Sequence, residues 1–230
     1  MMLLDLLRYY TIPVLKHKWH MLLTWTFFGI AIIYFGGFSI NIALTVLAIF
    51  LIISFGLTPM YTIANDYYTR RIELYLALRV RFTTYCLLLM LSTTVIVLFT
   101  TLLPMLIFIL LIYHTKLLTI LYIDIASKII GLVGSCIVSA LIGIVLGLWR
   151  PSFSFAGGAG TGIILALCII PIFTANYVRN DVLLYVPPLT PLFVENMLLK
   201  ITTTIAETAV LYYIAHIQYY KFFYKAKPVT

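Results

Sequence analysis

Charges of both signs are concentrated in one internal stretch of the chain, TIANDYYTRRIELYLALRVR, which covers residues 62–81. If this stretch is helical, Asp66 and Arg70 stand four residues apart and Arg70 and Glu73 three apart, so they share one face. Apolar residues fill the neighbouring and opposite faces, which suits an element held between a bilayer and a soluble partner. The alternative interpretation is a solvated helix whose side chains snorkel at the membrane surface.

A second candidate residue is Glu207, which four threonines accompany in an otherwise apolar run: Thr202, Thr203, Thr204 and Thr208. An ionisable group at mid-membrane costs at least about 2.5 kcal/mol and usually faces the protein interior or a wet cavity. Among the acidic residues, Glu207 is the one expected well inside a membrane span. Two roles fit it equally, a group that lines a substrate path and a neutral, hydrogen-bonded structural carboxyl.

Other residues that could do chemistry are poorly placed for it. The histidines lie at span ends or near the N-terminus, which disfavours a metal site: His17, His20, His114 and His216. Three cysteines lie inside apolar runs and have neither disulfide nor metal spacing: Cys86, Cys136 and Cys168. The run AGGAGTG lacks the Lys-Ser/Thr of a phosphate-binding loop, and no hydrolase or zinc-protease motif occurs. The sequence therefore indicates neither enzyme chemistry nor a cofactor on this chain.

The composition is that of a polytopic membrane protein. The 230 residues are 63% hydrophobic and 10% charged, with a mean hydropathy of +1.12, whereas a soluble domain is nearer half apolar and a quarter charged. No room is left for a soluble domain, so residues 1–230 form one transmembrane domain. The net charge of +8 does not indicate nucleic-acid binding, because the basic residues flank apolar runs and suit anchoring to anionic lipid.

The hydrophobic pattern predicts an all-α fold with six transmembrane helices, over residues 20–35, 40–58, 82–113, 125–148, 155–175 and 197–217. Residues 1–19 are amphipathic, which is typical of an N-terminal helix lying in the membrane interface. We expect Pro59 to end the second span and Pro104 to kink the outer half of the third. Residues 177–196 are partly apolar but too short to span twice, which predicts an outer re-entrant hairpin before the sixth span.

Small residues recur every fourth position along the predicted fourth span: Gly131, Ser135, Ser139, Gly143 and Gly147. Residues spaced by four lie on one face of a helix, and a face of small side chains lets another backbone approach closely. We therefore predict that this stripe is a helix-packing face.

The basic residues indicate the orientation in the membrane. With both termini in the cytoplasm, 11 of the 15 lie inside: Arg8, Lys16, Lys18, Arg70, Arg71, Arg79, Arg81, Arg150, Lys221, Lys225 and Lys227. Only Lys116, Lys128, Arg179 and Lys200 then lie outside. The positive-inside rule favours this arrangement in a multi-pass protein of the cell membrane.

In layout, the whole chain resembles the ABC type 2 exporter permeases, six-span subunits that work as dimers with separate ATP-binding-cassette ATPases. The coupling helix of that family has an acidic residue, then Gly-Thr, then Glu between apolar residues, then Pro. Asp66 matches the first acid and Ile72-Glu73-Leu74 the second element, whereas Arg70-Arg71 and Leu78-Arg79 replace Gly-Thr and Pro. YVPPLTPLFVENMLLK (residues 185–200) is similar to the family's proline-containing outer segment.

The resemblance implies a cytoplasmic coupling helix after the second span, which docks on an ATPase through Asp66, Tyr67, Arg70, Arg71 and Glu73. It also implies a substrate path, with Glu207 beside it, between two identical or homologous protomers, and ATP and magnesium bound on the partner chain. Three alternatives stay open: the membrane subunit of an energy-coupling-factor importer, an intramembrane enzyme using Glu207, and a non-transporting assembly protein.

Overall fold

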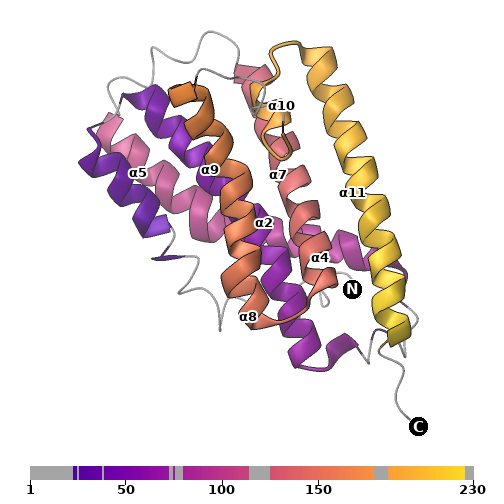
Figure 1. The fold of residues 1–230 in the computed structure, drawn as a ribbon. Helices are drawn as coiled ribbons and strands as arrows, with labels where there is room; N and C mark the ends of the chain where they lie inside the picture. Colours follow the sequence, from indigo (N-terminus) through magenta and orange to yellow (C-terminus); the bar gives the residue numbers. More distant parts are fainter. Residues whose placement is uncertain are drawn as a thin grey trace, which may run out of the picture.

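The chain folds into a bundle of long helices, as a computed structural model shows (Figure 1). The structure describes residues 23–24, 26–37, 39–72, 75, 80–113, 125–178 and 186–225. After a shorter apolar helix over Thr26–Phe35, the elements in chain order are α2 (Ile40–Tyr68), α4 (Phe82–Val97), η1 (Leu98–Leu102), α5 (Leu103–Tyr113), α7 (Ile125–Trp149), α8 (Phe153–Phe155), η2 (Ala156–Gly160), α9 (Thr161–Val178), α10 (Thr190–Phe193) and α11 (Met197–Lys225). No strand occurs among these described residues, so the predicted all-α fold is confirmed.

Five helices are long and apolar enough to cross a membrane: Ile42–Tyr68, Phe82–Tyr113, Ser127–Trp149, Phe153–Ile172 and Met197–Lys221. They are consistent with a multi-pass membrane protein, and the helices predicted over residues 82–113, 125–148, 155–175 and 197–217 are all present. The predicted first span lies partly outside the described residues, and the predicted interfacial helix over residues 1–19 lies wholly outside them. The number of six spans therefore stays a prediction.

The central helix α2 corrects the predicted end of the second span. It runs through Pro59 and ends only at Tyr68. Membrane helices tolerate proline where hydroxyl side chains and neighbouring helices support the backbone. In α2 the Thr58 hydroxyl donates to the Ser54 carbonyl and the Thr62 hydroxyl to the Thr58 carbonyl, each at 2.8 Å. The proline therefore lies inside a continuous 29-residue helix.

The third apolar helix is irregular just before Pro104. Residues Leu98–Leu102 form a π-helix, η1, between α4 and α5, and such wide turns free backbone carbonyls for other donors. The Thr26 hydroxyl donates to the Thr100 carbonyl at 2.7 Å, and the hydroxyls of Ser54 and Thr101 are 3.2 Å apart. The irregularity thus starts six residues before Pro104, and its residues hydrogen-bond to the neighbouring helices.

The small residues of α7 pack closely, but against two different partners. Ser139 donates to the Ile52 carbonyl of α2 at 2.6 Å. A β-carbon at Gly143 would collide with the Gly56 carbonyl of α2, and one at Gly147 would lie 2.9 Å from Ile63. Gly131 instead faces α10, where its β-carbon would lie 2.5 Å from the Pro191 carbonyl oxygen. Ser135, also in the stripe, is fully buried. The close approach predicted for Gly143 and Gly147 is therefore observed.

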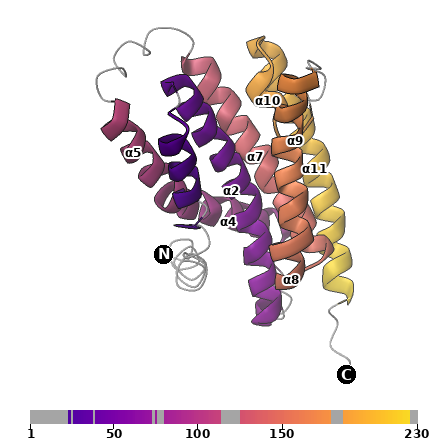
Figure 2. The same cartoon turned by 60° about the vertical axis from the view of Figure 1, so that its left-hand side comes forward.

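The helices after α7 complete the bundle around α2 and α7, as Figures 1 and 2 show. The glycine-rich residues 156–160 form a second π-helix, η2, and a β-carbon at Gly160 would lie 2.5 Å from the Met60 sulfur of α2. Residues 186–189 lead into α10, which packs on α7. Residues 179–185 of the predicted re-entrant hairpin lie outside the described residues, so its full course stays a prediction. The last helix, α11, packs on α7 and α10.

Candidate functional site at the end of α2

The charged stretch does not form the single helix over residues 62–81 that its pattern predicted. Residues 62–68 are the last two turns of α2, and the helix stops at Thr69, whose backbone N–H donates to the Asn65 carbonyl at 2.9 Å. Arg70 follows with a φ of 55°, the left-handed conformation that often ends helices and that glycine adopts most easily. Because the chain turns there, Asp66 and Arg70 do not share a helix face as they would in a single helix over residues 62–81.

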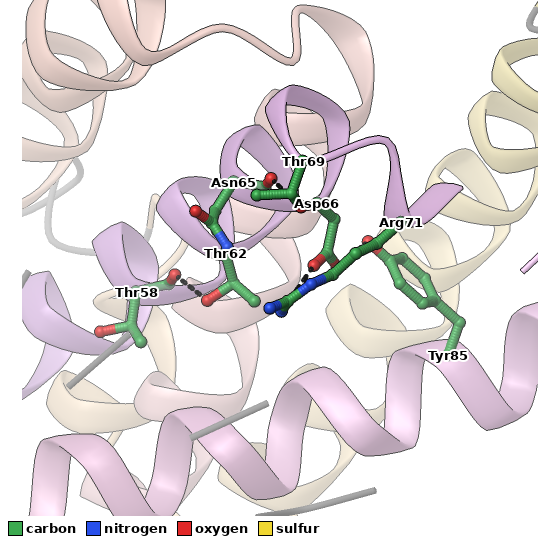
Figure 3. Close-up of polar contacts among 7 residues, drawn as sticks. All are labelled: Thr58, Thr62, Asn65, Asp66, Thr69, Arg71 and Tyr85. Atoms are coloured by element: carbon green, nitrogen blue, oxygen red, sulfur yellow. Dashed lines mark hydrogen bonds and ion pairs between the residues drawn. The ribbon is translucent and has the colours of Figure 1, made fainter. Parts of the chain in front are cut away.

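Asp66 forms an internal ion pair with Arg71 instead. The Asp66 side chain has no exposed surface and that of Arg71 is 15% exposed, with Nη1 and Oδ1 at 3.8 Å. Tyr85 of α4 donates to the other oxygen, Oδ2, at 3.3 Å. Figure 3 shows Arg71 folding back toward the carboxylate while Tyr85 approaches from the other side. Both groups therefore hold the residues after the turn against the end of α2.

Asp66 is a second buried acid that the sequence did not indicate, and it lies two residues before the end of the apolar helix Ile42–Tyr68. The hydropathy pattern placed Asp66 in a solvated segment because other charges follow it closely. Its burial results from a partner on α4, 19 residues further along the chain. A local sequence pattern does not report a tertiary contact of this kind.

Aromatic side chains extend the ion pair into a cluster that joins three parts of the chain. The ring of Tyr85 lies 5.6 Å from that of Tyr75 and 5.3 Å from that of Tyr219 on α11. Tyr219 also donates to the carbonyl of Val80, just before α4, at 2.9 Å. Offset and tilted ring pairs at these distances add about 0.5–1.5 kcal/mol beyond their buried area. The end of α2 is thus fixed to α4 and α11 as one unit.

The residues predicted to contact an ATPase divide into two groups. Tyr67 is 53% exposed and Arg70 is also exposed, whereas Asp66 and Arg71 point inward. Tyr68 is 77% exposed and makes an edge contact with Phe153 of α8, with ring centroids 5.8 Å apart. Glu73 lies outside the described residues. The structure therefore presents Tyr67, Tyr68 and Arg70 at the surface, on a base that Asp66 and Arg71 hold in place.

Glu207 lies in the N-terminal half of α11, whereas Tyr219 of the aromatic cluster lies in the C-terminal half. The residue is half-buried, its Oε2 atom is buried, and its carboxyl lies beside the hydroxyl of Thr190 on α10. That contact is looser than a regular hydrogen bond, because neither Oε2 nor the Thr190 hydroxyl has a partner within hydrogen-bonding geometry among the described residues. The carboxyl thus points into the protein, as predicted.

A buried cation near Glu207 was not predicted. Lys200 is only 3% exposed, and its ammonium donates to the carbonyl and the hydroxyl of Ser127 on α7, at 3.1 and 3.0 Å. The sequence suggested only a basic residue at the outer membrane edge. Lys200 and Glu207 are seven residues apart, which places both on one side of α11. This spacing was the one sign in the sequence that Lys200 could face the protein interior.

Within the described ranges, no group of three or more His, Cys, Asp or Glu side chains could hold a metal ion. Comparisons with protein-family models, with curated proteins and with solved structures give no match for this chain.

Proposed function

We propose that the chain is the membrane-spanning subunit of an ATP-binding-cassette exporter of the cell membrane. It would work as a dimer, with both termini in the cytoplasm, and be driven by a separate ATPase subunit that holds ATP and magnesium. The observation that carries this proposal is the end of α2, where an exposed tip (Tyr67, Tyr68 and Arg70) stands on a buried, charge-paired base. A soluble partner can move a membrane helix only through an exposed segment that is rigidly attached to it.

The packing of α2 supports a mechanical role. A helix of 29 residues is about 43 Å long, whereas the hydrocarbon core of a bilayer is about 30 Å thick. Its remaining length can project from the membrane while the rest packs on α4, α7 and α9. Close-packed helices shift between discrete arrangements rather than deform continuously, so a force at the tip would be felt throughout the bundle.

The proposal assigns two different roles to the predicted coupling residues. Tyr67, Arg70 and Glu73 contact the ATPase, whereas Asp66 and Arg71 position the tip. The substrate path runs between two protomers, with Glu207 as a polar group beside it. The Glu207 carboxyl lies beside Thr190 of α10 rather than among acyl chains, which is compatible with a polar group beside such a path and equally with a structural carboxyl.

Removal of a contact charge from the tip tests this function. A charge buried in an interface typically costs about 2–5 kcal/mol of binding when its partner is removed, whereas a solvated surface charge contributes about 0–1 kcal/mol. Arg70→Ala and Glu73→Ala should therefore release or uncouple the ATPase while the protein stays inserted and dimeric. The measurements are co-purification of the ATPase and ATP turnover in membranes.

Lys128→Ala is the matched control, because Lys128 is an exposed basic residue in the first turns of α7, at the other end of the bundle. It should keep wild-type association and turnover. If the Arg70 and Glu73 variants behave like this control, the tip is only a surface element and the exporter proposal loses its mechanical basis.

A further inference from the structure

Four buried side-chain oxygen atoms on α7, α10 and α11 have no hydrogen-bond partner among the described residues. They belong to Ser135 of α7, to Thr190 of α10, and to Glu207 and Thr208 of α11. The three helices pack on one another, and α10 lies where α7 and α11 come together (Figure 1). Buried oxygen atoms without a partner are rare in folded proteins, and a bound water or ion commonly accounts for them.

The side chains of Glu207 and Thr190 meet between α10 and α11. The carboxyl of Glu207 lies beside the Thr190 hydroxyl, and Thr190 is only 5% exposed. Thr208 follows Glu207 in the chain, and its hydroxyl oxygen is buried as well. One helix therefore supplies a carboxyl group with a hydroxyl next to it, and the neighbouring helix supplies a second hydroxyl.

Close packing of α7 brings the fourth oxygen atom to the same junction. A β-carbon at Gly134 would lie 3.0 Å from the β-carbon of Pro191 on α10 and 2.8 Å from the hydroxyl oxygen of Thr204 on α11. Thr204 is one turn before Thr208 on the same face of α11. Ser135 follows Gly134 and is fully buried. Because Gly134 approaches both α10 and α11, Ser135 lies at the junction of the three helices.

The chemistry of these four atoms indicates a small monovalent cation. All four are oxygen atoms, which are the ligands that hard cations prefer, and one of them belongs to a carboxyl group. A single carboxylate balances one positive charge, whereas a calcium or magnesium ion brings two. An anion is disfavoured, because it would lie against the carboxylate of Glu207.

Lys200 strengthens the preference for a single charge. Its buried ammonium is bound to Ser127, on the same side of α11 as Glu207. The seven residues between Lys200 and Glu207 correspond to about 10 Å of helix. A divalent ion would therefore meet repulsion from Lys200 without a second carboxylate to offset it, whereas a monovalent ion leaves only the charge of Lys200 in excess.

We propose that a sodium ion binds where α7, α10 and α11 meet, held by the side-chain oxygen atoms of Ser135, Thr190, Glu207 and Thr208. Glu207 supplies the negative charge, and the three hydroxyls supply neutral oxygen ligands. The bound ion joins three helices that are far apart in the sequence. This inference does not depend on the proposed function, because one chain contains all four ligands and no ATPase is needed to bind the ion.

Thermal unfolding of the purified wild-type chain in detergent tests the site. The unfolding midpoint is measured in sodium chloride and in choline chloride at equal ionic strength. At a sodium concentration about 100 times the dissociation constant, the midpoint should be about 5–10 °C higher than in choline chloride. Glu207→Gln should lose this difference, because the amide keeps the shape of the side chain but not its charge.

The hydroxyl ligands are tested by threonine-to-valine variants. Thr190→Val and Thr208→Val each remove one oxygen ligand at nearly constant shape, and each should raise the sodium dissociation constant about tenfold or more. Thr202→Val is the matched control, because Thr202 is an exposed threonine of the same helix as Thr208. It should keep the wild-type difference between sodium and choline.

Binding of radioactive sodium to the wild-type chain is a second measurement, which does not require any variant to fold. Equal midpoints in sodium and choline chloride, with no sodium bound, would overturn the site and indicate that water satisfies the four oxygen atoms. A full sodium response in Glu207→Gln would overturn it as well. Neither result bears on the exporter proposal, which the ATPase association of the Arg70 and Glu73 variants tests separately.

Discussion

At the scale of single residues, Asp66 is a fully buried carboxylate whose two polar partners come from outside its own helix. Removing a carboxylate from water costs several kcal/mol, and only well-placed partners return that energy. Arg71 lies 3.8 Å from Oδ1 and Tyr85 donates to Oδ2 at 3.3 Å, whereas Oδ1 accepts no hydrogen bond from the described residues, so these partners return part of that energy. The two adjacent arginines are therefore different in kind, since Arg71 completes a buried pair and Arg70 faces solvent.

Arg71→Ala should destabilise the protein far more than Arg70→Ala. The first change leaves the buried Asp66 carboxylate without its ion-pair partner, which typically costs about 3–5 kcal/mol. The second removes an exposed side chain, which usually changes stability by less than about 0.5 kcal/mol. The measurement is the free energy of unfolding of each variant in the same detergent. Equal losses for the two arginines would contradict the internal ion pair.

Arg70→Gly should be more stable than Arg70→Ala by about 1 kcal/mol, because residue 70 has a φ of 55° and this conformation strains any residue with a β-carbon. Both variants remove the same charge, so unfolding experiments on the pair isolate the backbone effect. Their ATPase affinities should fall together if the arginine charge makes the contact. A Gly variant no more stable than the Ala variant would show that the turn is unstrained.

At the scale of helices, hydropathy located the long elements well but not the end of α2. The length of an apolar run can be read from the local sequence. The helices that start at Phe82, Ile125 and Met197 were therefore predictable. Pro59 was a misleading signal, because its effect depends on support from threonine hydroxyls and from the neighbouring helix α7. The inward position of Asp66 could not be predicted either, since its partner Tyr85 comes from α4.

Gly143→Ala should destabilise the bundle, whereas Gly158→Ala should not. A β-carbon at Gly143 collides with the backbone carbonyl of Gly56, which cannot move without displacing α2. Overpacking of this kind costs about 1–3 kcal/mol or more, and Gly143→Leu together with Gly147→Leu should abolish folding or assembly. A β-carbon at Gly158 meets nothing within 4 Å, and alanine is the better helix former by about 1 kcal/mol.

Thermal unfolding and folded yield in detergent distinguish these two glycines. The predicted order of stability is Gly158→Ala at or above the wild type, then Gly143→Ala, then the double leucine variant. If both alanine variants lost a similar amount of thermal stability, the loss would come from replacing glycine as such and not from the close approach of α2 to α7.

At the scale of the whole molecule, the described basic residues on and beside α7 lie toward the two ends of the bundle. The first turns of α7 carry Lys128, and Lys200 is bound beside it to Ser127. Arg70 and Arg150 lie at the other end, near the contact of Tyr68 with Phe153. The fold thus shows which basic residues share a side, whereas the assignment of that side to the cytoplasm comes from the sequence count alone.

A cysteine at position 70 should react with a membrane-impermeant maleimide only from the cytoplasmic side, and one at position 116 only from outside. The reason is the division of the basic residues, 11 to 4, since cytoplasmic loops carry the excess of Lys and Arg. The native cysteines Cys86, Cys136 and Cys168 are buried, so the folded wild type gives the background. One apolar helix, Phe82–Tyr113, separates the two positions, and so they must lie on opposite sides if it crosses the membrane. Labelling of both from one side would show that it does not cross, whereas the reverse pattern would place the tip of α2 outside the cell, where no ATPase could reach it.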